Sequence, residues 1–145
     1  MKQSLSTYDK PYVGCLLGSA YHRLISRLEE CLRQESTGIT APEYLVLRAL
    51  YSRDGLQQCD ICEMVGKDKG AVSRTVGTLA HKGLVTTECV SHKCTCVWLT
   101  PKARQIEPVI MRIAGKRHKA LEDIAPKEDI ETMINVLQKI INNNL

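Results

Sequence analysis

Positively charged side chains gather in one part of this 145-residue chain, between Lys67 and Arg104. Two acidic residues in the same segment leave it a net charge of +5, whereas the whole chain carries +4. The basic residues of the segment are Lys67, Lys69, Arg74, Lys82, Lys93, Lys102 and Arg104. A local excess of positive charge on one compact unit is typical of nucleic-acid binding, because each cation can neutralise one phosphate. The alternative is an ordinary basic face in contact with solvent.

Thiol and imidazole side chains lie near the end of this segment, where they could hold a metal or form a disulfide. Zinc takes four sulfur or nitrogen ligands in a tetrahedron. The candidate ligands are Cys89, His92, Cys94 and Cys96. Cys89 and Cys94 could instead lie opposite each other across a hairpin and form a redox-switchable disulfide. Cys59-x-x-Cys62 belongs to a different element, and no second C-x-x-C completes the usual finger spacing. The remaining interpretation is that these thiols are reduced and have no specific role. We expect no bound metal.

Several function classes are not supported by any motif. The chain has no phosphate-binding loop, no G-x-S-x-G, no H-E-x-x-H and no persuasive pair of carboxylates, so we expect neither an enzyme nor a cofactor. No run approaches the roughly 18 apolar residues of a membrane span, and the first twelve residues lack the apolar core of a secretory signal. We therefore expect a cytoplasmic protein with no membrane partner. The seven cysteines then do not suggest a structural disulfide framework.

Helices are expected to position the first half of these residues. Apolar side chains at steps of three and four predict one long helix over residues 11–33. Thr40 caps a second helix, with Pro42 in its first turn and Glu43 three residues after the cap, which is a capping-box pattern. That helix ends near Gly55.

Two further helices follow in quick succession. The first covers about residues 59–65 and is closed by Gly66. The second is opened by Asp68, carries apolar residues at helical spacing and is stopped by Gly83.

A hairpin and two more helices complete the chain. Residues 84–90 and 94–99 favour strands, and Ser91, His92 and Lys93 form the tip between them. A long helix over about residues 101–124 and a cleanly amphipathic one after Pro126 follow. The expected order is α-α-α-α-β-β-α-α, which is mainly α with a small β-wing.

This order predicts a winged helix-turn-helix flanked by long dimerisation helices. We expect a single domain over residues 1–145, with the winged unit at 38–100 and the dimerisation helices at 1–37 and 101–145. The long helices have apolar faces that need another surface, and a second copy of the chain is the simplest one.

The chain resembles the MarR family of bacterial transcription regulators over nearly its whole length. The resemblance rests on the long first helix, ITAPEYLVL at 39–47, DKGAVSR at 68–74, LAHKGLV at 79–85 and Leu99-Thr100. It implies a homodimeric, sequence-specific DNA-binding regulator, expected to be a repressor that a small phenolic or other amphipathic effector releases. Its partners would then be double-stranded DNA, a second copy and that effector.

The resemblance and the charge pattern point to the same DNA-binding residues. Arg74 is the best candidate for a base or phosphate contact, and Lys67 and Lys69 for phosphate. The full set is Lys67, Lys69, Gly70, Ser73, Arg74, Ser91, His92 and Lys93. Wings of the family usually carry an Asp-x-Arg pattern at the tip, whereas this chain has Ser91-His92-Lys93. A lysine lacks the planar fork of arginine, so we expect a weaker or different contact in the minor groove.

Cys15 resembles the peroxide-sensing cysteine of one branch of the family, which is the basis of an alternative function as a redox regulator; a metal-responsive regulator on the same fold is the other alternative. A sensor needs a thiolate, and that branch uses tyrosines to support it. Ala41 stands where one of those tyrosines is expected, just before Pro42. Tyr12, Tyr21, Tyr44 and Tyr51 are the other possible donors. The alternative is a buried thiol that packs as a small hydrophobic side chain.

Overall fold

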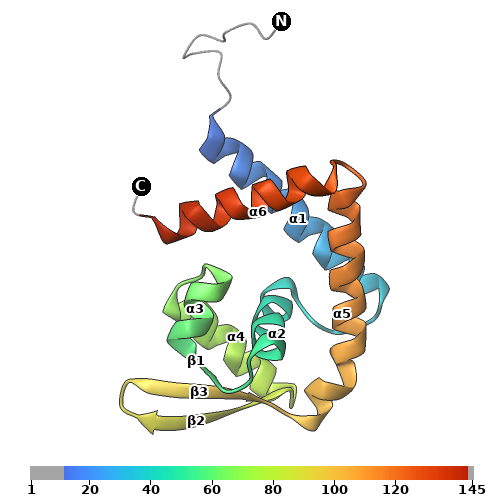
Figure 1. Ribbon diagram of the computed structural model, residues 1–145. Helices are drawn as coiled ribbons and strands as arrows, with labels where there is room; N and C mark the ends of the chain where they lie inside the picture. Colours follow the sequence, from blue (N-terminus) through green and yellow to red (C-terminus); the bar gives the residue numbers. More distant parts are fainter. Residues whose placement is uncertain (1–11, 144–145) are drawn as a thin grey trace, which may run out of the picture.

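The computed structural model describes residues 12–143, and it confirms the mainly helical class with a small β-wing (Figure 1). The helices are α1 (Val13–Gln34), α2 (Ala41–Ser52), α3 (Gln58–Val65), α4 (Lys69–His81), α5 (Pro101–Glu122) and α6 (Lys127–Asn142). The strands are β1 (Leu56–Gln57), β2 (Val85–Ser91) and β3 (Cys94–Leu99). Residue 11, the expected start of the first helix, lies outside the described residues.

Local capping signals set the helix boundaries where the sequence predicts them. The side chain of Thr40 accepts a hydrogen bond from the backbone of Glu43, and the side chain of Glu43 accepts one from the backbone of Thr40. At the start of α4, Asp68 Oδ1 accepts the backbone N–H of Ala71 at 2.7 Å. Gly66 ends α3 with φ at +67°, a left-handed conformation that favours glycine.

The sheet has one strand more than the sequence predicts. Its order is β1-β3-β2, and all neighbours are antiparallel. β1 has only two residues, which is too short to show an alternating pattern. It is held by packing, because Leu56 pairs with Val97 and both side chains are buried in the core.

The register of the β2–β3 hairpin, which we call the wing, corrects one expectation. Cys89 pairs with Thr95 and not with Cys94, because the register shifts between Cys89 and Ser91. Ser91 instead pairs with Cys94. Directly paired residues share a face of the sheet and successive residues alternate, so Cys89 and Cys94 lie on opposite faces. The predicted Cys89–Cys94 disulfide is therefore wrong.

One hydrophobic core holds the helix-turn-helix against the long helices. Leu47 and Leu50 of α2 and Leu79 of α4 are fully buried, together with Ile61 of α3 and Ile110 of α5. Figure 1 shows the arrangement that results: α2, α3, α4 and the sheet form one end of the molecule, α6 crosses α1 at the other end, and α5 runs between them. The core therefore fixes α4 and the wing relative to α5.

The far end leaves apolar side chains uncovered. Tyr21 and Leu24 of α1 and Met133 and Ile134 of α6 are each about two-fifths exposed or more. A groove of about 890 Å³ lies among α1, α5 and α6. Its apolar lining includes Leu17, Tyr21, Leu24, Leu121, Met133 and Leu137. Across residues 12–143, no helix has the length and apolarity that crossing a bilayer requires.

Candidate nucleic-acid interface

One face of α4 is exposed along the whole helix and carries four of the residues predicted to bind DNA. Further exposed residues follow these four at steps of about four positions, toward the C-terminal end of α4. The stripe consists of Lys69, Gly70, Ser73, Arg74, Gly77, Thr78 and His81. The opposite face is buried through Val72, Val76 and Leu79. Helical periodicity thus brings together Lys69, Gly70, Ser73 and Arg74, and adds His81, which the sequence reasoning did not select.

The side chain of Arg74 lies back along α4 toward the helix start. A Cβ atom placed on Gly70 would be 3.7 Å from Nη1 of Arg74 and 3.4 Å from Oδ1 of Asp68. Long helical side chains point toward the N-terminus, so this direction is expected. Gly70 leaves room for the guanidinium, and the backbone N–H groups of the first turn add positive potential beside it.

Lys67 stands just before the cap of α4 and makes contact with a distant helix. Its Nζ atom lies 5.2 Å from the ring centroid of Tyr21 in α1, within the range of a cation–π interaction. Tyr21 also lines the apolar groove among α1, α5 and α6. Lys67 therefore links the start of α4 to the groove.

Besides Lys67, which lies over the ring of Tyr21, three of the seven basic residues of the segment are committed to ion pairs or hydrogen bonds inside the molecule. Lys82 pairs with Glu43. Lys102 donates to the backbone carbonyl of Lys82 at 2.7 Å, and Arg104 pairs with Asp54 and Glu107. Among the residues that the structure describes, no ion pair involves Lys69, Arg74 or Lys93. Fewer cations are therefore available to contact phosphates than the net charge of the segment suggests.

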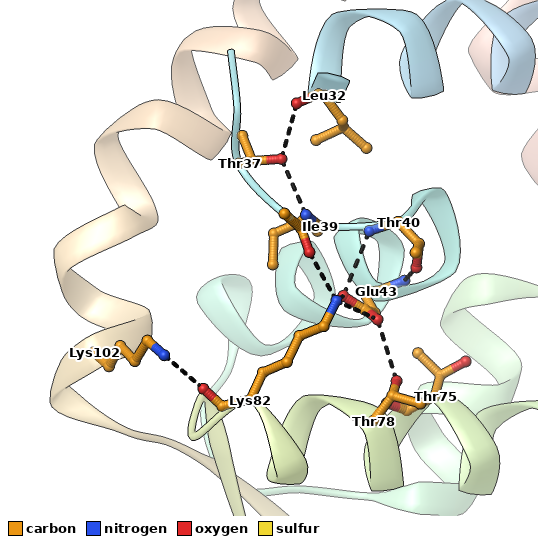
Figure 2. Close-up of polar contacts among 10 residues, drawn as sticks. Leu32, Thr37, Ile39, Thr40, Glu43, Thr75, Thr78, Lys82 and Lys102 are labelled. Atoms are coloured by element: carbon orange, nitrogen blue, oxygen red, sulfur yellow. Dashed lines mark hydrogen bonds and ion pairs between the residues drawn. The ribbon is translucent and has the colours of Figure 1, made fainter. Parts of the chain in front are cut away.

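The buried carboxylate of Glu43 and the partly exposed side chain of Lys82 form a polar network that fixes the end of α4 to the start of α2 (Figure 2). Glu43 is only 3% exposed. Lys82 Nζ lies 2.9 Å from Oε1 and 2.7 Å from Oε2 of Glu43, and it also donates to the carbonyl of Gly38 at 2.7 Å. The hydroxyl of Thr78 lies 3.2 Å from Oε1. A buried carboxylate needs such partners, since burying an unpaired charge is costly.

Only half of this network could be predicted from the sequence. The capping-box pattern pairs Glu43 with Thr40, whereas charge alone places Lys82 among the cations expected to contact nucleic acid. Glu43 and Lys82 are 39 residues apart. No local signal in either segment predicts that they meet.

The wing places its three predicted residues at an exposed tip. His92 and Lys93 form the turn, and Ser91 is the last residue of β2. All three are exposed. Figure 1 shows the wing extending from the side of the molecule that is farthest from α6. Its single cation, Lys93, is thus separate from the stripe on α4.

Within the described residues, the structure does not bring Cys15 together with a tyrosine donor, as a peroxide sensor would require. Cys15 is exposed near the start of α1, and no hydrogen bond in the described part of the chain joins it to Tyr12, Tyr21, Tyr44 or Tyr51. Tyr51 instead donates to the carbonyl of Ala103 at 2.7 Å, and Tyr44 accepts from Arg48.

The alternative zinc ligands are also not gathered. Cys89 and Cys94 lie on opposite faces of the wing, as the register shows. Over residues 12–143, no group of three or more His, Cys, Asp or Glu side chains is placed to hold a metal ion.

Comparison with known proteins agrees with this fold. The MarR family model matches residues 37–93. Transcriptional regulator HosA of Escherichia coli O157:H7 is 22% identical over 132 residues, which cover 88% of this chain and 98% of that protein.

Solved structures match over almost the full length. CouR from Rhodococcus jostii RHA1, bound to p-coumaroyl-CoA, has a TM-score of 0.81 at 20% identity and covers 98% of this chain and 99% of its own. The S. aureus MepR–DNA complex has a TM-score of 0.77 at 21% identity, with 92% and 98% covered. At these identities the structures establish the winged-helix fold.

Proposed function

Because this chain belongs to the MarR family of transcription regulators, we propose that it works as a homodimeric, sequence-specific DNA-binding repressor released by a small-molecule effector. The observation that carries the proposal is the exposed stripe of α4. It presents Lys69, Ser73 and Arg74 at the start of a helix whose other face is buried in the core. This half of a recognition helix is the part that meets base edges in the major groove.

Each predicted residue has a role in this arrangement. Arg74 contacts a base edge or a phosphate, because its guanidinium donates in a planar fork. Lys67 and Lys69 contact phosphates on either side of the cap of α4. Gly70 and Ser73 allow close approach of the helix. Ser91, His92 and Lys93 contact the adjacent minor groove or its backbone, with Lys93 supplying the charge.

The exposed apolar surface at the far end supports a homodimer. Tyr21, Leu24, Met133 and Ile134 belong to helices that the proposal assigns to dimerisation, within residues 1–37 and 101–145. A monomer rarely leaves a large apolar surface uncovered. A second copy seated on α1 and α6 would cover it and would present two α4 helices to half-sites one helical turn apart, about 34–36 Å. Residues 38–100 then form the DNA-binding unit.

Repression and release follow from the same geometry. A dimer seated on two half-sites obstructs polymerase sterically. The structures similar to this chain include CouR bound to p-coumaroyl-CoA and NadR in complex with 4-hydroxyphenylacetate. We therefore propose a phenolic or similarly amphipathic effector, held between the dimerisation helices and the winged unit. The contact of Lys67 with Tyr21 is one physical connection between these two parts.

Fluorescence anisotropy with labelled duplexes from the DNA flanking the gene tests the proposal. Wild-type protein should bind one fragment in preference to a scrambled duplex at moderate salt. Arg74→Ala should weaken that binding by about tenfold or more, since a bidentate base contact contributes about 1–3 kcal/mol. Arg33→Ala is the matched control, because Arg33 is exposed on α1 away from the stripe. Equal binding by wild type and Arg74→Ala would contradict the role of α4.

A further inference from the structure

Lys67 occupies the turn between α3 and α4, where the backbone is fixed on both sides. Its backbone N–H donates to the carbonyl of Cys62 at 3.2 Å, and together with the left-handed Gly66 this bond closes the end of α3. One residue later, Asp68 caps the start of α4 through its hydrogen bond with Ala71. The freedom that remains at this position therefore lies in the flexible four-carbon side chain of Lys67.

The side chain of Lys67 is directed at α1. Its Nζ atom lies 5.2 Å from the ring centroid of Tyr21, and no ion pair among the described residues involves this lysine. Lys67 is exposed, and Tyr21 is about half exposed. The face of an aromatic ring attracts a cation because its π-electrons make that face negative. The ring of Tyr21 is thus the partner that the structure gives to this ammonium group.

The ring and the DNA of the proposed function lie on different sides of Lys67. Tyr21 belongs to α1, which lies with α6 at the end of the molecule opposite the wing (Figure 1). The proposed function places DNA along the exposed stripe of α4 and the wing. One ammonium group cannot lie over the ring and also reach a phosphate on the other side. The two contacts of Lys67 therefore exclude each other.

We propose that Tyr21 is an autoinhibitory partner of Lys67, which holds the lysine away from the phosphate backbone until DNA replaces the ring. The inference rests on the proposed function, which gives Lys67 its phosphate contact. Tyr21 lowers duplex affinity about two- to fivefold, which corresponds to the about 0.5–1 kcal/mol of an exposed cation–π contact. A phosphate contact carries no base information, so the factor is the same for a specific and a scrambled duplex.

Nuclear magnetic resonance of the full-length protein with isotope-labelled lysine tests the contact without DNA. The ring current of Tyr21 shields groups above its face, so the ε-methylene resonance of Lys67 should lie upfield of its unperturbed position. Lys67→Met identifies this resonance. Tyr21→Phe keeps a ring and should keep the upfield shift, whereas Tyr21→Leu should abolish it. Tyr12→Leu is the matched control, because Tyr12 is an exposed tyrosine at the start of α1 and no cation in the described residues lies over its ring.

Fluorescence anisotropy with labelled duplexes tests the autoinhibition. Tyr21→Leu should tighten the binding of specific and scrambled duplexes by the same factor of about two to five, and Tyr21→Phe should bind like wild type. In a Lys67→Met background, Tyr21→Leu should change nothing, because no cation remains to be released. Wild type gives an independent test, since saturating duplex should remove the upfield shift of Lys67.

Three results would overturn the proposal. One is a Lys67 resonance that is the same in wild type and in Tyr21→Leu. Another is an upfield shift that persists when wild type is saturated with duplex. The third is weaker binding by Tyr21→Leu, or an effect of the same size in the Lys67→Met background. If wild type binds no duplex, the proposed function and the autoinhibition both fail, whereas the lysine resonance still decides whether Lys67 contacts Tyr21.

Discussion

The Nζ atom of Lys82 lies 2.7 Å from Oε2 of Glu43, so the end of α4 is tied to a buried carboxylate at the start of α2. Lys82→Met would leave that carboxylate without its cation. Breaking a fully buried pair costs about 3–5 kcal/mol, and we expect about 2–3 kcal/mol because the Lys82 side chain is 35% exposed. Urea denaturation monitored by circular dichroism measures the change.

A nearby lysine provides the control for this prediction. Lys102→Met removes only an exposed hydrogen bond to the carbonyl of Lys82, so its effect should stay below about 1 kcal/mol. The double variant Glu43→Gln/Lys82→Met should be less destabilised than the sum of the two single variants, because no unpaired charge remains. Additive effects would mean that Glu43 and Lys82 are not coupled.

Gly55 is expected to tolerate no side chain. Its φ is +73°, and a Cβ atom there would lie 2.5 Å from the ring of Trp98. Gly55→Ala should lower the free energy of unfolding by about 1–3 kcal/mol, through both backbone strain and the clash. Gly77→Ala is the matched control in α4, where nothing lies within 4 Å of the added Cβ. It should raise stability by about 0.5–1 kcal/mol, and a loss at Gly77 equal to that at Gly55 would refute this reasoning.

Tyr51 is expected to contribute to the free energy of unfolding, and this contribution should decrease at alkaline pH. Burial, with the charge of Glu107, raises the pKa of Tyr51 from 10.0 to about 12. A raised pKa contributes stability below the pKa of the unfolded state, and this contribution is lost as the pH rises through the folded value. The advantage of wild type over Tyr51→Phe in thermal denaturation should therefore be full below about pH 10 and shrink toward pH 12. An advantage that stays constant over this range would contradict the burial of the hydroxyl.

Glu35 is expected to contribute stability at neutral pH, and this contribution should decrease at acidic pH. Its hydrogen bond with Arg112 lowers the pKa of the carboxyl below 4.5, and Lys116 acts in the same direction. A lowered pKa contributes stability above the unfolded value that is lost as the pH falls through the folded one. Glu35→Gln should lower Tm at neutral pH, and the difference from wild type should shrink below about pH 4.5. A difference that grows on acidification would exclude this pairing of α1 with α5.

Local signals explain why much of the fold could be predicted from the sequence. Thr40 with Glu43 and Asp68 with Ala71 act within three residues, so their caps appear where the sequence places them. β1 was missed because its two residues show no periodicity and are held only by pairing with β3. The other differences between the sequence-based expectation and the structure, which concern Lys82 and the register of the wing, depend on contacts between residues outside one helix or turn.

In the candidate site, too, the features set by local sequence were predictable and those set by distant contacts were not. The exposed stripe of α4 follows from helical periodicity, so the solvent-facing positions of Lys69, Ser73 and Arg74 could be predicted from the sequence. The pairing of Lys82 with Glu43 spans 39 residues and was not predictable. The register shift in the wing moved Cys89 opposite Thr95, because a bulge changes which residues face each other.

The salt dependence of duplex binding tests the central claim most directly. Each phosphate contact contributes about 0.9 to the slope of log Kd against log salt concentration. Lys69→Ala should reduce that slope by about 0.9 relative to wild type, and Lys93→Ala should do the same if the wing touches the backbone. Lys102→Ala, which removes a cation used inside the molecule, should leave the slope unchanged. An unchanged slope in Lys69→Ala, with Lys102→Ala reducing it instead, would contradict the assignment of DNA binding to the exposed stripe of α4.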